Sequence, residues 1–280
     1  MHRGRQNTTN ASKSMCVSRI LRINLVLLFV VLLCATPLRA QIRNDSIFVV
    51  DHGAIIRGNS ATKSVALVFT GDEFADGAET IAQTLRDRGV KASFLFTGRF
   101  YRNPQFKSVI VRLKREGHYL GAHSDEHLLY CDWNNRDQLL VNRERFEDDL
   151  NQNFKAMASF GIRKNDARFF LPPFEWYNQT ISDWTVAMDL QLVNFTPGTR
   201  SNADYTTPEM KNYVDSNTII GSIKDYETRD PQGLNGFILL SHIGVAPART
   251  DKFYNRLNKL IAFLKSKKYQ LVRIDQLLKT

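Results

Sequence analysis

The chain has 280 residues, of which 43% are hydrophobic, and a formal net charge of +10. Its length fits one large α/β domain, and its apolar content is sufficient for a sizeable core. No internal repeat or low-complexity tract interrupts the pattern. The positive charge is concentrated at the N-terminus, so it does not indicate a nucleic-acid partner.

The first forty residues have the layout of a secretory signal peptide. They contain six basic residues and no acidic one, and the apolar run at residues 25–33 is too short for a comfortable transmembrane helix. Cleavage after Leu38-Arg39-Ala40 lowers the net charge to +4. Met15 is an alternative start. Lipidation at Cys34 is a competing interpretation, although the small residues that a lipoprotein signal requires are absent before it. We expect a secreted or periplasmic protein without a stable membrane span.

The number and positions of the cysteines are compatible with an exported chain that has no internal disulfide. Cys16 and Cys34 fall within residues 1–40, so Cys131 alone remains after cleavage. An intramolecular disulfide is then impossible, and Cys131 is interpreted as a packed thiol.

After the signal peptide, residues 41–63 form a poorly patterned lead-in, and one α/β domain is expected over residues 64–280. The continuous apolar run at residues 65–69 predicts a strand that is covered on both faces. A helical pattern over residues 76–88 and a second apolar run at residues 92–96 follow, which predicts a βαβ unit.

The alternation continues to the C-terminus. Further strands are expected at residues 119–122, 168–171, 192–195, 218–223, 237–240 and 270–274. Further helices are expected at residues 104–116, 136–160, 179–189, 207–216 and 249–267. This order favours a parallel sheet in an α/β barrel, where the carboxyl ends of the strands form a mouth at which distant motifs meet.

Chemically suggestive groups follow four of these strands. They are Asp72 and Glu73, His123 and His127, Pro172-Pro173-Phe174-Glu175, and His242. Two neutral imidazoles and one carboxylate are the usual protein ligands of a catalytic divalent metal, zinc by default, although cobalt or nickel suits the same set. A second carboxylate can take a proton from the metal-bound water, and a separate histidine can protonate the leaving group. The pattern predicts metal-assisted hydrolysis.

The order of these motifs resembles the polysaccharide deacetylases, which are carbohydrate esterase family 4 with its NodB homology domain, over about residues 65–278. The resemblance implies a distorted seven-stranded (β/α)7 barrel and an acetylated glycan as substrate. It also implies Asp72 as the general base, Glu73, His123 and His127 as metal ligands, and His242 as the general acid.

The same resemblance implies the surroundings of the acetyl group. Leu240 lies near the pocket for the acetyl methyl, and Asp204-Tyr205 is a loose match to an Asp-Trp motif whose Asp supports the acid. The residues assigned to substrate binding are Pro173, Phe174, Trp176, Tyr205 and Leu240. The aromatic members are equally compatible with core packing and with stacking on sugar rings. Asp132-Trp133 also resembles an Asp-Trp motif, but it follows the histidine pair directly and is interpreted as a loop anchor.

Three departures from the family pattern leave the activity open. Glu73 is longer than the usual aspartate, Leu171 replaces the arginine that orients the base, and Glu175 stands where glycine is usual. The sequence therefore supports a secreted metal-dependent deacetylase and, as an alternative, a non-catalytic glycan-binding protein on the same barrel. Hydrolysis of another C–N or ester bond is a third possibility.

Overall fold

The computed structural model describes residues 47–279, so the expected signal peptide lies outside the described part. The strands in this part are β1 (Val49–Asp51), β2 (Ala54–Arg57), β3 (Ser64–Gly71), β4 (Ser93–Phe96), β5 (Tyr119–Ala122), β6 (Phe169–Phe170), β7 (Gln191–Leu192), β8 (Phe237–His242) and β9 (Gln270–Val272). The α-helices are α2 (Ala78–Asp87), α3 (Gly98–Arg102), α4 (Lys107–Arg115), α5 (Arg143–Ala158), α6 (Gln179–Ala187), α7 (Ser216–Arg229), α8 (Leu257–Ser266) and α9 (Ile274–Leu277). Short 3-10 helices include η3 (Pro173–Glu175) and η4 (Ser201–Tyr205).

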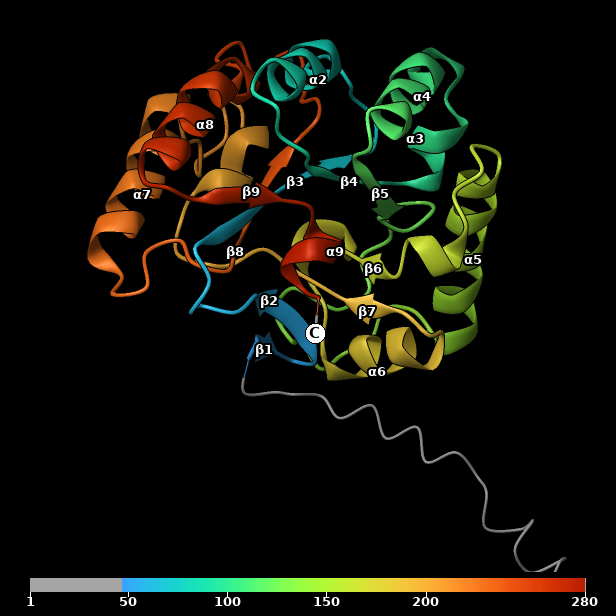
Figure 1. Ribbon diagram of the computed structural model, residues 1–280. Helices are drawn as coiled ribbons and strands as arrows, with labels where there is room; N and C mark the ends of the chain where they lie inside the picture. The colour runs from blue at the N-terminus through green and yellow to red at the C-terminus, as the bar shows by residue number, and fades with distance from the viewer. Residues whose placement is uncertain (1–46, 280) are drawn as a thin grey trace, which may run out of the picture. The chain divides into compact units, whose positions relative to one another are not determined.

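The strands form one curled sheet in the order β1-β2-β8-β3-β4-β5-β6-β7, and β9 also pairs with β3. Neighbours from β8 through to β7 are parallel, whereas β1 and β2 are antiparallel additions. A bridge between Ile55 in β2 and Val193, just after β7, brings the two sides of the sheet together. Helices α2 to α8 lie around the outside of the sheet, whereas the short helix α9 is drawn across the middle of this view (Figure 1). This arrangement confirms the expected α/β barrel.

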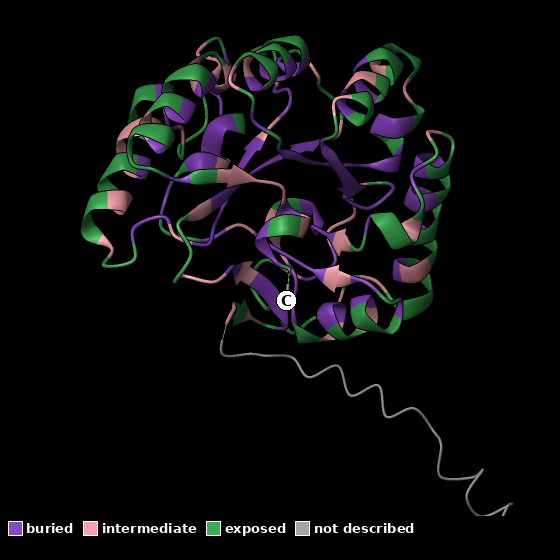
Figure 2. Ribbon diagram, viewed as in Figure 1, coloured by how far each residue is buried: buried purple, intermediate pink, exposed green. Residues whose placement is uncertain are grey.

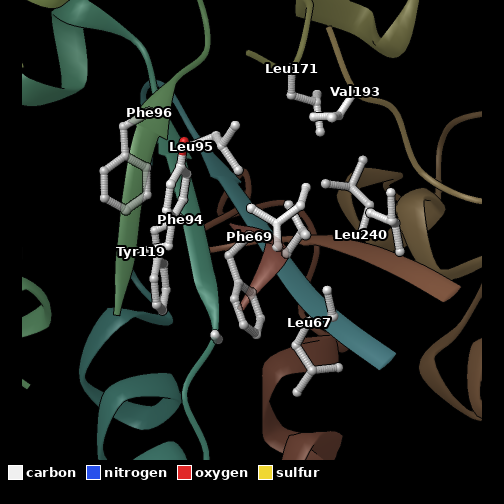
Figure 3. Packing of buried hydrophobic residues seen from close by; sticks show 14 of the residues in the cluster. Leu67, Phe69, Phe94, Leu95, Phe96, Tyr119, Leu171, Val193 and Leu240 are labelled. Atoms are coloured by element: carbon white, nitrogen blue, oxygen red, sulfur yellow. The ribbon is translucent and has the colours of Figure 1, made fainter. Parts of the chain in front are cut away.

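The core lies within this sheet and between the sheet and the helices. Val68 in β3 is opposite Leu240 in β8, and both are fully buried. On α2, Ile81 and Leu85 are four residues apart and face the core, as their spacing predicts. Figure 2 shows buried strands and outer helices whose far sides are exposed, and Figure 3 shows part of the apolar cluster.

Two of the elements predicted for the C-terminal half of the chain are wrong. Residues 218–223 belong to α7 rather than to a strand, and residues 207–216 do not form a helix. Asp215 caps α7 by accepting two backbone N–H bonds of its first turn. Ile219 and Ile223 are both buried, so a short β-branched apolar run here is one face of a helix.

Other elements differ in extent. The expected helix at residues 136–160 begins only at Arg143, because residues 130–140 form a loop closed by a bridge between Cys131 and Leu139. Part of the lead-in, which carries no clear pattern, forms β1 and β2. Cys131 is buried, as expected for a packed thiol. No helix within residues 47–279 is long and apolar enough to cross a membrane.

Candidate active site

Four adjacent strands deliver polar side chains to one edge of the barrel. In the sheet, β8, β3, β4 and β5 are neighbours and run in the same direction, so their carboxyl ends lie together. Thr70 near the end of β3 is opposite His242 at the end of β8. The groups that follow these strands therefore face a common mouth, as in other parallel barrels.

The histidine pair is placed as two neutral imidazoles. The Nδ1 atom of His123 lies 2.8 Å from the carbonyl oxygen of Leu171, which can only accept, so Nδ1 donates and Nε2 keeps a lone pair. The ring centroids of His123 and His127 are 5.1 Å apart. Burial lowers the pKa of His123 well below its usual range. Burial also lowers the pKa of His127 to about 4, against the opposing effect of nearby Asp72. Both rings are therefore suited to binding a metal ion.

His242 is in the opposite electrostatic environment. Its Nδ1 lies 2.6 Å from Oδ1 of buried Asp204, and its backbone N–H donates to Oδ2 of the same carboxylate at 2.9 Å. Burial by itself favours the neutral ring, but the charge of Asp204 and its hydrogen bond outweigh burial and raise the pKa of His242. The ring of Tyr205 is 5.5 Å from that of His242, and Tyr205 is exposed.

Glu175 is a second carboxylate that acts on His242. Burial raises the pKa of Glu175 to about 7, while the charge of Glu175 helps to raise the pKa of His242. Glu175 and the preceding Phe174 have φ angles of 55° and 58°. This left-handed backbone costs about 1–3 kcal/mol for a non-glycine residue, and such strain is typical of functional sites. The sequence identified Glu175 only as an unusual residue at the rim.

Asp72 is held by donors that the sequence analysis missed. Arg99, in the first turn of α3, donates through Nε to Oδ1 at 3.1 Å and through Nη2 to Oδ2 at 2.5 Å. The hydroxyl of Thr97 donates to Oδ1 at 2.8 Å. Leu171, which stands at the position of the family's arginine, has a fully buried side chain in the apolar core. Arg99 therefore supplies the guanidinium that Leu171 cannot provide, and its position three residues after β4 does not by itself reveal this contact.

Glu73 is not part of a preformed ligand group with the histidine pair. It is exposed and lines a pocket of about 720 Å³ together with Phe74, Asp76 and Lys252. Within residues 47–279, no three His, Cys, Asp or Glu side chains converge as a preformed metal site. Of the two carboxylates after β3, Asp72 is the one whose charge acts on His127.

The other residues predicted to bind substrate divide into buried and accessible ones. Pro173 and Leu240 are buried, and Leu240 is part of the core between β3 and β8. Phe174 is 41% exposed, and its ring centroid lies 4.5 Å from that of His127. Trp176 is half-buried and donates from Nε1 to the carbonyl oxygen of Asp132 at 3.1 Å. The accessible aromatic surface thus lies beside the histidine pair.

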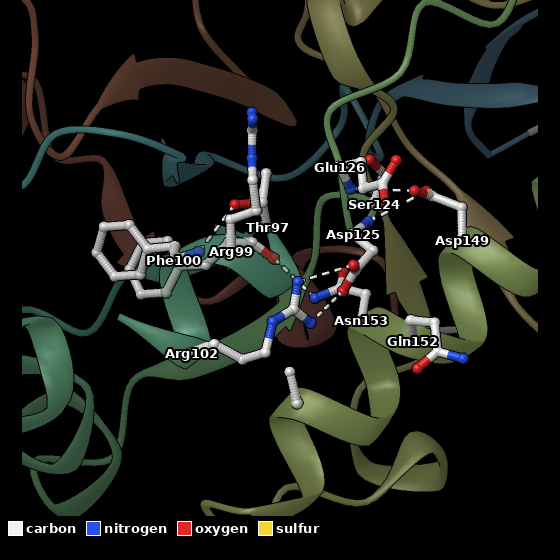
Figure 4. Close-up of polar contacts among 12 residues, drawn as sticks. Thr97, Arg99, Phe100, Arg102, Ser124, Asp125, Glu126, Asp149, Gln152 and Asn153 are labelled. Carbon is white, nitrogen blue, oxygen red and sulfur yellow. Dashed lines mark hydrogen bonds and ion pairs between the residues drawn. The ribbon is translucent and has the colours of Figure 1, made fainter. Parts of the chain in front are cut away.

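Helix α5 fixes the loop that carries this pair (Figure 4). Buried Asp149 accepts the backbone N–H groups of Asp125 and Glu126 and the hydroxyl of Tyr130. Asn153 accepts the backbone N–H of His123 at 3.0 Å. Sequence analysis missed these positioning residues because polar residues on an amphipathic helix do not reveal which of them point inward.

Residues 57–193 match the sequence profile described as polysaccharide deacetylase. The chain belongs to the polysaccharide deacetylase family. This family comprises hydrolases that act on amide or ester bonds. A search of curated proteins finds no match.

Solved structures of this family share the fold. A peptidoglycan N-acetylglucosamine deacetylase, Bc1960, aligns at 18% identity with a TM-score of 0.63, covering 80% of this chain and 92% of its own. PdaA of Bacillus subtilis, a family 4 carbohydrate esterase, aligns at 20% identity with a TM-score of 0.63, covering 81% and 85%. BA3943 of Bacillus anthracis, described as a family 4 pseudoenzyme, aligns at 17% identity with a TM-score of 0.61, covering 82% and 70%. At these identities the likeness establishes the fold alone.

Proposed function

We propose that this polysaccharide deacetylase is a metal-dependent enzyme that hydrolyses N- or O-linked acetyl groups of a polysaccharide or oligosaccharide. One observation carries the proposal: burial keeps His123 and His127 neutral by lowering each pKa, whereas Asp204 raises the pKa of His242. When the environment of a site pushes the pKa values of its titratable groups apart, the difference indicates which group acts as an acid and which stays neutral or acts as a base. The glycan class is supported by the peptidoglycan substrate in the name of Bc1960.

The roles follow from this separation. His123 and His127, with Glu73 as the carboxylate, would hold a divalent ion, zinc by default or cobalt or nickel, which when bound polarises the acetyl carbonyl and a water molecule. The two imidazoles fit such an ion, whereas Glu73 does not form a preformed ligand group with them. Asp72 takes the proton of the attacking water. His242, held by Asp204, gives a proton to the departing nitrogen or oxygen of the glycan.

The first test is acetate release by residues 41–280 from a panel of N- and O-acetylated oligosaccharides, with zinc and with a chelator. We expect release that requires the metal, and the active members of the panel then identify the substrate. Release that is unaffected by complete metal removal would contradict the metal-dependent mechanism.

Two adjacent variants test the roles of the carboxylates. Asp72→Asn should retain zinc and lower kcat by about 100-fold or more, because it removes a general base. Glu73→Gln should weaken zinc binding by at least about tenfold, since it removes a charged ligand. Zinc affinity is measured by chelator competition and kcat by acetate release. Loss of zinc in Asp72→Asn together with its retention in Glu73→Gln would assign the ligand role to Asp72.

A second candidate is a non-catalytic glycan-binding protein. The lack of a preformed group of three ligands within residues 47–279 favours it, and the likeness to the pseudoenzyme BA3943 is consistent with it. In that case the zinc-loaded protein should bind an acetylated oligosaccharide in calorimetry without releasing acetate.

We also propose export through a cleavable signal peptide. The basic and apolar pattern of residues 1–40 supports this. Mass spectrometry of the protein recovered from the envelope or medium should give a chain that begins at Gln41. Recovery of the uncleaved chain from the cytoplasm would contradict export.

A further inference from the structure

We propose that Trp133 and Phe174 form an outer subsite that stacks against a pyranose ring of the glycan chain, next to the ring that carries the reacting acetyl group. This inference rests on the proposed function and adds a residue, Trp133, that the motif pattern does not assign to substrate. The ligand class is a chain of linked pyranoses rather than a single sugar.

The subsite is continuous with the candidate active site. The ring centroid of Phe174 lies 4.5 Å from that of His127 and 5.8 Å from that of Trp133. Trp133 is therefore only one ring removed from a proposed metal ligand. A glycan that is bound with its acetyl group beside His127 can therefore extend across these two rings.

Trp133 is exposed although it is among the largest apolar residues. The residue is 55% exposed, and Phe174 is 41% exposed. One side of the Trp133 indole is covered by Trp176, whose ring is stacked on it at a centroid distance of 5.6 Å and an interplanar angle of 27°. More than half of Trp133 thus stays open to solvent. Open aromatic faces attract the apolar C–H face of a sugar ring.

The loop that carries Trp133 is held in place, so the stacking surface is formed in advance. Trp176 donates from Nε1 to the carbonyl oxygen of Asp132, and the Asp132 carboxylate accepts the backbone N–H groups of Asn134 and Asn135 at 2.8 Å. Arg136 is on this same loop, and its guanidinium lies 4.6 Å from the ring centroid of Trp176. A preformed surface avoids the entropic cost of ordering a loop when the ligand binds.

A sugar ring fits these observations better than a second protein. Specific protein interfaces bury about 800 Å² on each partner, whereas the exposed aromatic surface here comes from two side chains. Most of the other residues in the loop are polar or charged, among them Asn134, Asn135 and Asp137. A narrow aromatic strip with a polar border matches a single saccharide chain.

The experiment uses oligomers of N-acetylglucosamine and O-acetylated xylo-oligosaccharides, each from one to six residues long. For Trp133→Ala we expect about a tenfold loss of kcat/KM on the hexamers, mainly through KM, and little change on the single sugars. Trp133→Phe should restore most of the loss. Val186→Ala, which removes an exposed apolar side chain on α6, is the control and should behave as the wild type.

The outcomes separate the subsite from the reaction. Hexamer binding that is weakened by Trp133→Ala in calorimetry, without acetate release by the wild type, would retain the subsite and reject the deacetylase. Acetate release whose dependence on chain length is unchanged in Trp133→Ala would reject the subsite and retain the deacetylase. Failure of the wild type to bind any hexamer would reject the subsite, and a concentration-dependent dimer that is lost in Trp133→Ala would assign the surface to self-association.

Discussion

The hydrogen bonds that Asp72 already accepts limit how many further protons its carboxylate can bind. An ionised carboxylate offers about four lone-pair positions. Thr97 and the Nε of Arg99 occupy two on Oδ1, and the Nη2 of Arg99 occupies one on Oδ2. The remaining position on Oδ2 is sufficient to accept one proton from water. Asp72 is therefore oriented before substrate arrives.

Removing Arg99 should test this orientation. Arg99→Ala is expected to lower kcat by about tenfold to 100-fold with little change in stability, because the Arg99 side chain is 45% exposed. Arg99→Lys should recover only part of the activity, since an ammonium cannot make the two parallel bonds. The control Arg143→Ala removes an exposed arginine on α5. Unchanged kcat in Arg99→Ala would show that Asp72 does not depend on this contact.

Leu171→Arg should not substitute for the lost contact. The Leu171 side chain is fully buried, so a guanidinium there has no place among apolar neighbours. We expect this variant to unfold at a lower denaturant concentration and to give no gain in activity, as measured by urea unfolding and acetate release. A stable and more active Leu171→Arg protein would contradict the role assigned to Arg99.

The pH dependence should reveal the effect of Glu175 on the proposed acid. The negative charge of Glu175 helps to raise the pKa of His242, so Glu175→Gln should lower that pKa. Because His242 must be protonated to act as an acid, the alkaline limb of the kcat profile should move to lower pH. Glu144→Gln on the surface of α5 is the control. An alkaline limb that stays in place would show that another group sets it.

At the scale of elements, α5 acts as a support for the loop after β5. Its residues Asp149 and Asn153 bind backbone groups of that loop, and Asn153 also donates from Nδ2 to the carbonyl oxygen of Phe96 at 3.2 Å. One helix thereby ties the end of β4 to the segment that carries the histidine pair. The position of the histidines thus depends on residues about thirty positions further along the chain.

Asp149→Ala should destabilise the fold as well as the site. It leaves two backbone N–H groups and a tyrosine hydroxyl without their acceptor, which costs about 3 kcal/mol. Urea unfolding measures the loss, and zinc binding should weaken in parallel. The control Asp148→Ala removes an exposed carboxylate on the same helix and should change the free energy of unfolding by less than about 0.5 kcal/mol. Equal stability of the two variants would contradict the supporting role of α5.

At the scale of the whole molecule, the first described strands help to close the barrel. The backbone N–H of Asn194 donates to the carbonyl oxygen of Ile55 at 3.0 Å. The hydroxyl of Thr196 donates to the carbonyl oxygen of Ile56 at 2.5 Å. Arg57, largely buried, donates to the carbonyl oxygens of Gly233 and Asn235 at 2.8 Å. The two sides of the sheet are thus joined by a segment that precedes the main alternation of strands and helices.

A chain that begins at residue 58 should therefore be less stable than one that begins at residue 47. Without β2, the edge of β8 is exposed and the donors of Asn194 and Thr196 lose their acceptors. We expect a melting temperature lower by about 10 °C and a greater tendency to aggregate. Calorimetry and light scattering would measure both. Equal melting temperatures would show that β1 and β2 are dispensable for closure.

The sequence by itself determined the barrel class and much of the element order. Strands such as β3, β4, β5 and β8 are buried on both faces, so each appears in the sequence as a short and largely apolar run. The histidine pair follows one such run directly, and its spacing is visible without any fold. At residues 218–223 the prediction of a strand failed, because a short run of β-branched apolar residues can also form the buried face of a helix.

Only the tertiary structure decided which charged groups face one another. Arg99 meets Asp72, Glu175 acts on His242, and Trp133 lies beside Phe174 through contacts between separate strand-end loops. A sequence pattern records the period of one element, whereas these contacts depend on the order of strands in the sheet and on the direction of each side chain. For that reason the substitution of Arg99 for the arginine absent at residue 171 could be seen only after the chain was folded.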